Sequence, residues 1–209
     1  MTLTGKAVAG VATTGLLGGA GVGSYYAFGN FETISGRLTK EKFELLDTSK
    51  TNNDWTTVFT AYQKATKNTF TGAKDTSLDE AGLRRKCEGI LKKTPDDSNY
   101  KLAKQWCVKE KAVSKILDDL NLRFLDTTSD SSNTIKDKAH WNSKVAQYER
   151  SQATNKITVN LTGNDDAKAT AMRDACKTLN TPELKTTTDG FIEKLEQIQK
   201  WCAIGKDIK

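Results

Sequence analysis

The sequence predicts an all-α protein, in which an N-terminal transmembrane or signal helix precedes a duplicated domain with three helices and one disulfide in each repeat. Three observations support this fold class. Only Pro95 and Pro182 interrupt a chain of 209 residues that is 36% hydrophobic and 28% charged, a composition that favours soluble helices over disorder. Apolar residues recur at helical spacing. The dipeptide Trp-Cys occurs twice, at residues 106–107 and 201–202.

Residues 1–29 are expected to form a membrane anchor or a signal segment. Residues 7–29 carry no charged side chain, and as a helix they would reach about 34 Å, which is enough to cross the hydrocarbon core of a bilayer. Ala27 and Gly29 also fit the small-residue pattern that a signal peptidase cleaves. A retained anchor, a cleaved signal and a flexible glycine- and alanine-rich tail therefore stay open as alternatives.

This segment predicts a single-pass protein of the cell membrane with its C-terminal domain outside the cell, or a secreted domain if the segment is cleaved. The membrane is then its first expected partner. Gly15, Gly19 and Gly23 have the four-residue spacing that lets two membrane helices self-associate. The orientation stays open, because only Lys6 precedes the segment while several cations follow it.

Residues 30–53 are expected to be a stalk that carries one short amphipathic piece, GRLTKEKFELL. Beyond it, three blocks recur in the same order, which indicates an internal duplication of roughly 90 residues. The first two blocks have i, i+4, i+7 spacing, so each places its residues on one helical face. The aligned sets are Trp55, Phe59 and Tyr62 with Trp141, Val145 and Tyr148; Leu83, Cys87 and Ile90 with Met172, Cys176 and Leu179; and Ala103, Trp106 and Cys107 with Ile198, Trp201 and Cys202.

The duplication sets the expected domain boundaries. Repeat 1, with a helix that joins the two repeats, covers residues 54–125, and repeat 2 covers residues 138–209. The joining helix is expected in residues 113–125, where apolar residues follow helical spacing. Residues 126–137, DTTSDSSNTIKD, are expected to be a polar linker because they offer few groups to bury.

The four cysteines are expected to form two disulfides. Cys87 and Cys107 flank the turn of a helical hairpin, and Cys176 and Cys202 occupy the matching positions of the second repeat. Four cysteines allow three connectivities. The pairing Cys87–Cys107 with Cys176–Cys202 is favoured because each of its bonds closes within one repeat. The alternative is four reduced, buried thiols in a cytoplasmic protein. A zinc site is disfavoured because the chain has no CxxC motif and its one histidine, His140, lies in another segment.

Residues 84–115 are unusually basic. They hold ten lysines and arginines against four acidic residues, an excess of six that equals the net charge of the chain. The cations are Arg84, Arg85, Lys86, Lys92, Lys93, Lys101, Lys104, Lys109, Lys111 and Lys115. On a helical hairpin they would form a lobe that attracts anionic partners, such as acidic glycans or lipid headgroups outside a cell and nucleic acid inside it. The simpler alternative is a solvated face that keeps the domain soluble. Nucleic acid is not expected, since the lobe lacks an aromatic series for stacking on bases.

Catalytic motifs are missing from the sequence. It contains no HExxH, no GxSxG and no phosphate-binding loop that opens a helix. No residue is therefore assigned to catalysis, to a cofactor or to a metal, and the protein is not expected to be an enzyme.

One resemblance to known proteins is carried by CEGIL and YKLAKQWCV, followed by VSKIL and later HWNSKV. With these stretches the chain resembles the large paralogous families of uncharacterised proteins in haemotropic mycoplasmas, over nearly its whole length and most specifically in residues 100–108. The resemblance implies a membrane-anchored, surface-exposed or secreted protein involved in antigenic diversity or contact with a host-cell surface protein. It implies no catalytic residues.

The expected function is therefore that of a surface antigen or host-interaction module whose outward-facing residues make the contacts. The alternative is a reduced binding module at the cytoplasmic face of the membrane, whose basic lobe, residues 84–115, contacts nucleic acid or anionic lipid.

Overall fold

The computed structural model describes residues 33–129 and 134–208, and within them the chain is mostly helical, as the sequence predicts. A small two-stranded antiparallel sheet was not predicted. The elements are α1 (Ile34–Lys40), α2 (Asn53–Lys64), α3 (Glu80–Leu91), α4 (Asp97–Trp106), α5 (Val113–Asp119), β1 (Leu122–Phe124), α6 (Lys138–Arg150), α7 (Asp165–Leu179), α8 (Phe191–Gln197), the π-helix η2 (Ile198–Cys202) and β2 (Ala203–Gly205). The predicted membrane segment, residues 1–29, lies outside the described residues, among which no helix is long and apolar enough to cross a bilayer.

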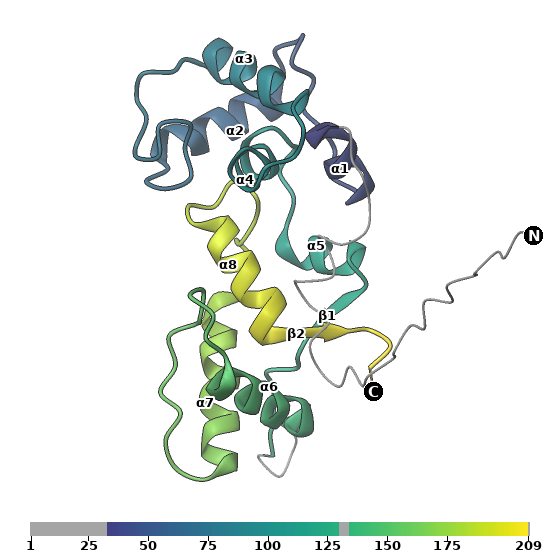
Figure 1. Ribbon diagram of the computed structural model, residues 1–209, viewed down its shortest axis with the longest axis vertical. Coiled ribbons are helices and arrows are strands. Elements are labelled where there is room, and N and C mark those ends of the chain that lie inside the picture. Colours follow the sequence, from purple (N-terminus) through teal and green to yellow (C-terminus); the bar gives the residue numbers. More distant parts are fainter. Residues whose placement is uncertain (1–32, 130–133, 209) are drawn as a thin grey trace, which may run out of the picture.

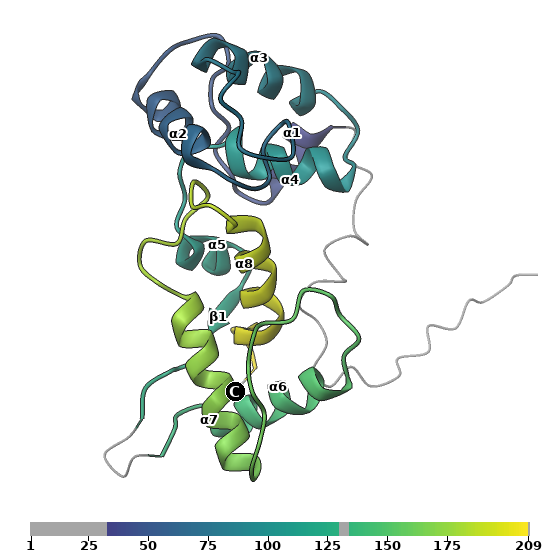
Figure 2. The same ribbon diagram turned by 90° about the vertical axis from the view of Figure 1, so that its left-hand side faces the viewer.

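The molecule consists of two halves that lie end to end along its long axis (Figure 1). Helices α1 to α4 form one end, α6 and α7 form the other end, and α5 and α8 lie between them. The view turned by 90° shows the same order (Figure 2). A continuous cluster of buried apolar side chains runs through both halves, so the two halves share one core.

Polar side chains cap the starts of five helices. Thr33, Asn52, Asp79, Asp96 and Asn164 each accept a hydrogen bond from the backbone N–H three residues on, at the starts of α1, α2, α3, α4 and α7. These caps satisfy donors that the first helical turn leaves free. Each cap precedes an amphipathic run, so the local sequence determines where the helix begins and its apolar face determines how it packs.

The first tryptophan of each half makes the same hydrogen bond. The indole N–H of Trp55 in α2 donates to the carbonyl of Asp47 at 2.8 Å, and that of Trp141 in α6 donates to the carbonyl of Asp126 at 3.2 Å. Each of these aspartates also accepts, through Oδ1, the N–H and the hydroxyl of the residue two positions on. Because a buried indole needs a partner for its N–H, these bonds attach each helix to the segment before it.

The tryptophans of the two Trp-Cys pairs are also held alike. Trp106 packs edge-on against Tyr62 with ring centroids 5.1 Å apart, and Trp201 packs against Tyr148 with centroids 5.0 Å apart. Each indole N–H donates to the backbone carbonyl of an asparagine in the loop after α2 or α6. The repeated dipeptide therefore occupies equivalent positions in the two halves, with both tryptophans almost completely buried.

Residues 33–53, predicted to be a stalk, are part of the first half. Ile34 and Leu38 of α1 are fully buried. The chain then turns at Lys42, whose φ of 62° is left-handed, into an extended segment. There the N–H of Leu46 donates to the carbonyl of Cys107 at 3.0 Å. The stalk prediction was wrong because the amphipathic run is only two turns long and its packing partners lie far away in the sequence.

Residues 113–125, predicted to be one joining helix, repeat this structure. Helix α5 has seven residues, as α1 has, and the chain turns at Asn121, whose φ of 55° is again left-handed. The strand β1 pairs with β2, and the N–H of Leu125 donates to the carbonyl of Cys202 at 2.9 Å. The repeated unit therefore begins with α1 in the first half and with α5 in the second, 20 and 25 residues earlier than the predicted starts of the repeats at 54 and 138.

The predicted linker, residues 126–137, is held to the second half at its described ends. The guanidinium of Arg123 donates to both carboxylate oxygens of Asp137, at 2.5 and 3.0 Å, and the same carboxylate accepts the N–H of Asp126. Its polar residues were expected to be solvated, but their carboxylates instead satisfy nearby backbone and guanidinium donors.

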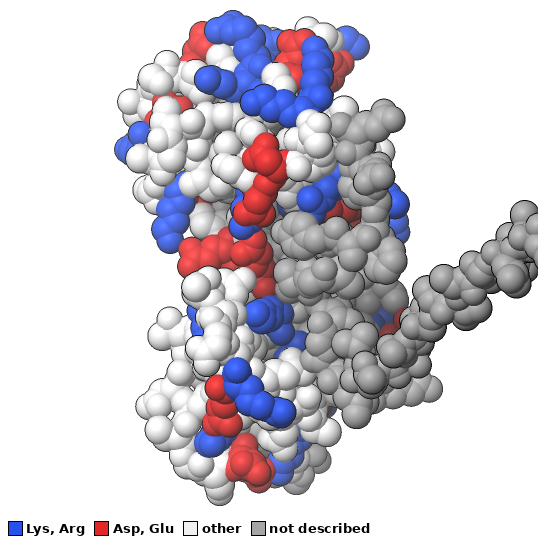
Figure 3. Space-filling model, in the orientation of Figure 1, with Lys and Arg blue, Asp and Glu red and all other residues white. Residues whose placement is uncertain are grey.

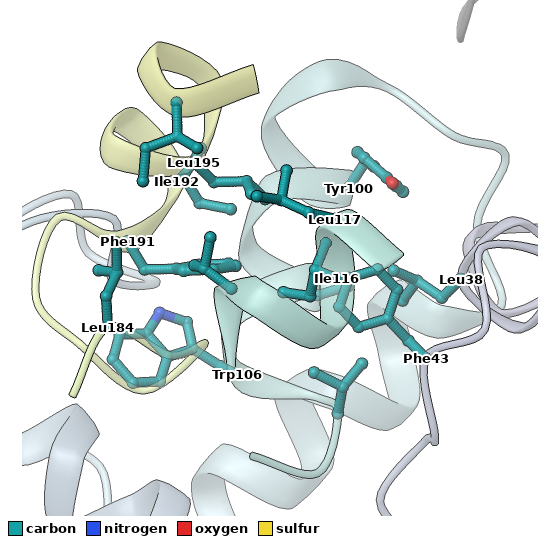
Figure 4. Packing of buried hydrophobic residues seen from close by; sticks show 14 of the residues in the cluster. Leu38, Phe43, Tyr100, Trp106, Ile116, Leu117, Leu184, Phe191, Ile192 and Leu195 are labelled. Atoms are coloured by element: carbon teal, nitrogen blue, oxygen red, sulfur yellow. The ribbon is translucent and has the colours of Figure 1, made fainter. Parts of the chain in front are cut away.

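The two halves meet around α5. Figure 4 shows Ile116 and Leu117 of α5 between Phe43 of the first half and Phe191 and Leu195 of α8. These side chains are nearly fully buried, and apolar area removed from water stabilises the contact at about 25 cal/mol per Å². The shared core therefore fixes how the halves are arranged.

Polar groups surround this apolar centre. The carboxylate of Asp189 accepts the N–H and the hydroxyl of Thr66 and the N–H of Lys67, at 3.1, 2.6 and 3.3 Å. Gln105, which is fully buried, accepts from the amide of Asn68 at 2.6 Å and donates to a carbonyl in the loop before α8 at 3.2 Å. These bonds give the junction one register, because a shifted arrangement would leave buried polar groups unpaired.

Candidate functional surface

The two predicted disulfides are confirmed. Cys87 in α3 is bonded to Cys107 at the end of α4, and Cys176 in α7 is bonded to Cys202 in the π-helix. Their Cα atoms are 5.4 and 5.6 Å apart, and all four residues are fully buried. The bridges therefore act inside the core, where they fasten α3 to the end of α4 in the first half and α7 to the π-helix in the second.

The ten cations of residues 84–115 do not form one open basic lobe. Seven of them lie within 4.0 Å of a carboxylate oxygen: Arg84, Lys92, Lys101, Lys104, Lys109, Lys111 and Lys115. Lys109 reaches Glu44 at 2.9 Å and Lys111 reaches Asp119 at 2.5 Å. Much of the local positive charge is thus balanced by acids that lie elsewhere in the sequence.

The most deeply buried of these pairs joins α1 to α4. The carboxylate of Glu41 accepts from Lys104 at 3.0 Å, from Arg37 at 3.1 Å and from the hydroxyl of Tyr100. Burial alone would raise the pKa of Glu41, but Lys104, the Tyr100 hydroxyl and Arg37 outweigh it and hold that pKa below its ordinary value. Burial also lowers the pKa of Lys104, against the pull of Glu41. Lys104 is therefore a structural cation and is not available to an external anion.

Three of the ten cations remain exposed with no carboxylate within ion-pair distance among the described residues: Arg85, Lys86 and Lys93. Together with Lys92, which pairs with Glu88 on the surface, they follow helical spacing along one side of α3 and the turn after it, and we call these four residues the α3 basic face. Gly89 lies in its middle with open space beyond it. Figure 3 shows Lys and Arg side chains gathered over this end of the molecule, with some acidic side chains among them.

The equivalent face of α7 is not basic. With the second helices aligned on their cysteines, Arg85 and Lys86 correspond to Asp174 and Ala175, and Lys93 corresponds to Pro182. The two helices share only part of their buried face, since Leu83 and Met172 are both fully buried, as are the two cysteines. The basic face is therefore a property of the first half that the shared fold does not require.

No metal centre can be assembled from the described residues, which contain no group of three or more His, Cys, Asp or Glu side chains able to hold an ion. No catalytic or cofactor-binding residue was predicted from the sequence. Comparison of the chain with protein-family models, curated proteins and solved structures finds no match.

Sequence analysis missed the buried carboxylate of Glu41 and the other acids that neutralise the basic segment. Glu44 and Asp119 lie outside residues 84–115, so a local count of charges could not include them. One clue was present, because Glu41 follows Arg37 by four residues, the spacing at which two side chains meet on a helix.

One buried lysine lies outside the predicted basic set. Lys144 in α6 is 8% exposed, and its ammonium donates to the carbonyl of Lys200 in the π-helix at 2.7 Å. Burial lowers the pKa of Lys144 to about 8. The position of α2 at the same distance from its tryptophan holds Val58, which is fully buried. The fold therefore accepts an apolar side chain at this place.

Replacing Lys144 with methionine should change how stability depends on pH. The pKa of Lys144 is about 8 in the folded state and about 10.4 in the unfolded chain. Below about pH 8 the lysine is charged in both states, and burying that charge costs about 3 kcal/mol of stability. This cost disappears as the pH rises from about 8 to about 10.4, because over that range the unfolded chain binds more protons than the folded one. The stability of Lys144→Met relative to the unmodified protein should therefore fall by about 3 kcal/mol between about pH 7 and 10.5, measured by urea unfolding.

A matched control is Lys177→Met on the exposed face of α7. Its stability difference from the unmodified protein should stay constant over the same pH range. A constant difference for Lys144→Met as well would show that burial does not perturb this lysine.

Proposed function

We propose that the protein is a membrane-tethered helical module outside the cell, acting as a surface antigen or in host contact and without catalysis. The observation that best supports this is the pair of buried disulfides, one in each half. Structural disulfides persist in oxidising compartments and are rare in reducing ones. The uncharged residues 7–29 supply a segment for export and for anchoring.

The surface of the described residues is suited to polar contacts. All four tryptophans and all four cysteines are buried, and the only exposed large hydrophobic side chain among the described residues is Ile208. Interfaces of stable obligate complexes present larger apolar patches. The surface therefore fits soluble display and reversible polar binding better than a permanent apolar interface.

The alternative of a reduced module at the cytoplasmic face has less support. It needs free thiols, whereas the described cysteines are all paired. It also needs an open basic lobe, whereas seven of the ten cations have carboxylate partners.

Thiol labelling of the protein in its native cells tests the proposal. Proteins would be alkylated under denaturing conditions with and without reductant, and peptides would then be mapped by mass spectrometry. We expect no alkylation before reduction, together with linked peptides that contain Cys87 with Cys107 and Cys176 with Cys202. Protease added to intact cells should also remove the domain while sparing cytoplasmic markers. Four freely alkylated thiols, or a domain that resists protease until the cells are lysed, would contradict the proposal.

A further inference from the structure

We infer that the α3 basic face (Arg85, Lys86, Lys92 and Lys93) docks on anionic lipid headgroups of the membrane that holds the N-terminal segment. The docked face would seat the first half of the domain on the lipid surface. This inference rests on the proposed membrane tether and adds a partner and an orientation to it.

The chain enters the domain beside this face. The N–H of Ile34, the first residue of α1, donates to the carbonyl of Lys93 at 2.8 Å. The charge-free segment ends at Gly29, five residues before Ile34, and an extended chain of that length spans at most about 18 Å. An anchor that ends at Gly29 therefore lets Lys93 reach the headgroups, where the potential of anionic lipids extends over a Debye length of about 8 Å.

The charges on the face are available for such a contact. Arg85, Lys86 and Lys93 are exposed, and no carboxylate of the described residues lies within ion-pair distance of them. The Lys92–Glu88 pair is itself exposed, with 72% and 52% of the two side chains accessible, so water already screens it and a lipid phosphate can compete for the ammonium. Gly89 keeps the middle of the face free of side chain.

The second half shows that this charge is dispensable for folding. The matching residues are Asp174 and Ala175 on α7 and Thr181 and Pro182 after it, although α3 and α7 carry a buried disulfide at the same place. The basic face is thus confined to the half that the tether enters.

Docking at this face also orients the long axis. Helix α3 lies at one end of the molecule, and α6 and α7 lie at the opposite end (Figure 1). With the α3 basic face on the lipid, the α6–α7 end points away from the membrane and presents the loop between these helices, residues 151–164, to the surroundings.

Lysine footprinting on the full-length protein tests this inference. The protein would be reconstituted in vesicles of neutral phosphatidylcholine, with or without about 30% anionic phosphatidylglycerol, then acetylated briefly and analysed by mass spectrometry. Lys86 and Lys93 should react at least about fivefold more slowly in the anionic vesicles. Lys177, which is exposed on α7, should react equally in both.

A pair of equal-charge variants separates the face from the overall charge. Arg85→Glu keeps both reporter lysines and should remove most of their protection, whereas Lys177→Glu should leave it intact. Raising the salt concentration should weaken the protection of the unmodified protein, because the attraction is screened.

The possible outcomes distinguish this inference from the proposed function. Failure of the protein to float with neutral vesicles would contradict the tether itself. Flotation with equal acetylation of Lys93 in both lipids would overturn the docking surface alone. Protection by a soluble acidic polysaccharide, but not by anionic vesicles, would assign the face to a glycan and overturn the lipid assignment.

Discussion

Replacing Cys87 and Cys107 with alanine is expected to lower the free energy of unfolding by about 3 kcal/mol. The bridge joins residues 20 positions apart, and without it the unfolded chain regains the conformational freedom of that loop. Both cysteines are fully buried, so the variant also loses packing beside Trp106. Urea unfolding followed by circular dichroism measures the change, since tryptophan fluorescence would respond to the missing sulfur as well.

The second bridge provides a comparison for the first. Cys176 and Cys202 are 26 positions apart, so their replacement with alanine should cost a similar amount by the loop argument. Its loop contains Asp189 and the other polar groups that contact the first half. This variant should therefore also increase hydrogen exchange at Thr66 and Lys67, whereas the first variant should not. Losses below about 1 kcal/mol for both pairs would show that the bridges do not stabilise the fold.

The second large effect is expected for Glu41→Gln, which should destabilise the protein by about 3–5 kcal/mol. The change leaves Lys104 buried beside Arg37 without a neutralising carboxylate. The side chains of Lys104 and Glu41 are only 11% and 7% exposed, so water cannot replace the lost partner. Glu44→Gln is the matched control, because Glu44 lies three residues on and its pair with Lys109 is exposed; it should have little effect.

The pH dependence of this variant has a definite sign. Because the folded-state pKa of Glu41 is lowered, its contribution to stability is present above the unfolded carboxyl pKa of about 4.3 and is lost as the pH falls through the folded-state value. The difference in the free energy of unfolding between Glu41→Gln and the unmodified protein should therefore become smaller as the pH falls from about 7 to 3. A difference that stays the same across this pH range would contradict the assignment of Glu41 as a charged carboxylate that stabilises the fold.

The second half suggests how the cluster can be replaced as a whole. The residues at matching positions are Ile116 for Arg37, Leu120 for Glu41, Leu195 for Tyr100 and Gln199 for Lys104. Ile116 and Leu195 are nearly fully buried. Exchanging all four residues should recover most of the stability that Glu41→Gln loses, since removing a buried charge cluster completely leaves no charge unpaired.

The features that were predicted correctly from the sequence are those that local patterns encode. Helical spacing located the helices of both repeats around Trp55 and Trp141, and the presence of one cysteine pair within each repeat gave the correct disulfides. Both depend on residues that are close in the sequence or that recur at one spacing.

The start of each repeat was missed for physical reasons. The turns at Lys42 and Asn121 have positive φ without glycine; asparagine is enriched at such positions but lysine is not, and the strands β1 and β2 have only three residues each. One sign was present in the sequence. Leu46 and Asp47 are followed by threonine, as are Leu125 and Asp126, and these pairs occupy equivalent places in the two halves.

The candidate surface could be predicted only in part. The charges of α3 are visible in the sequence, but their availability depends on which cations find acids elsewhere. Lys104 and Lys111 pair with Glu41 and Asp119, whereas no carboxylate of residues 33–129 and 134–208 lies within ion-pair distance of Lys93. The proximity of Lys93 to the point where the chain enters the domain depends on one backbone hydrogen bond to Ile34, which no sequence pattern encodes.

The two disulfides also determine how far the chain can lengthen under a pulling force. The bridged residues lie 20 and 26 positions apart, so about 70 Å and about 90 Å of contour length stay locked while the bridges are intact, at about 3.5 Å per residue. All of α4 and all of α8 lie inside these closed loops. A force applied between the N-terminal end and the chain beyond Cys202 would therefore not stretch α4 or α8. The oxidised protein would reach full extension at a shorter length than the reduced one.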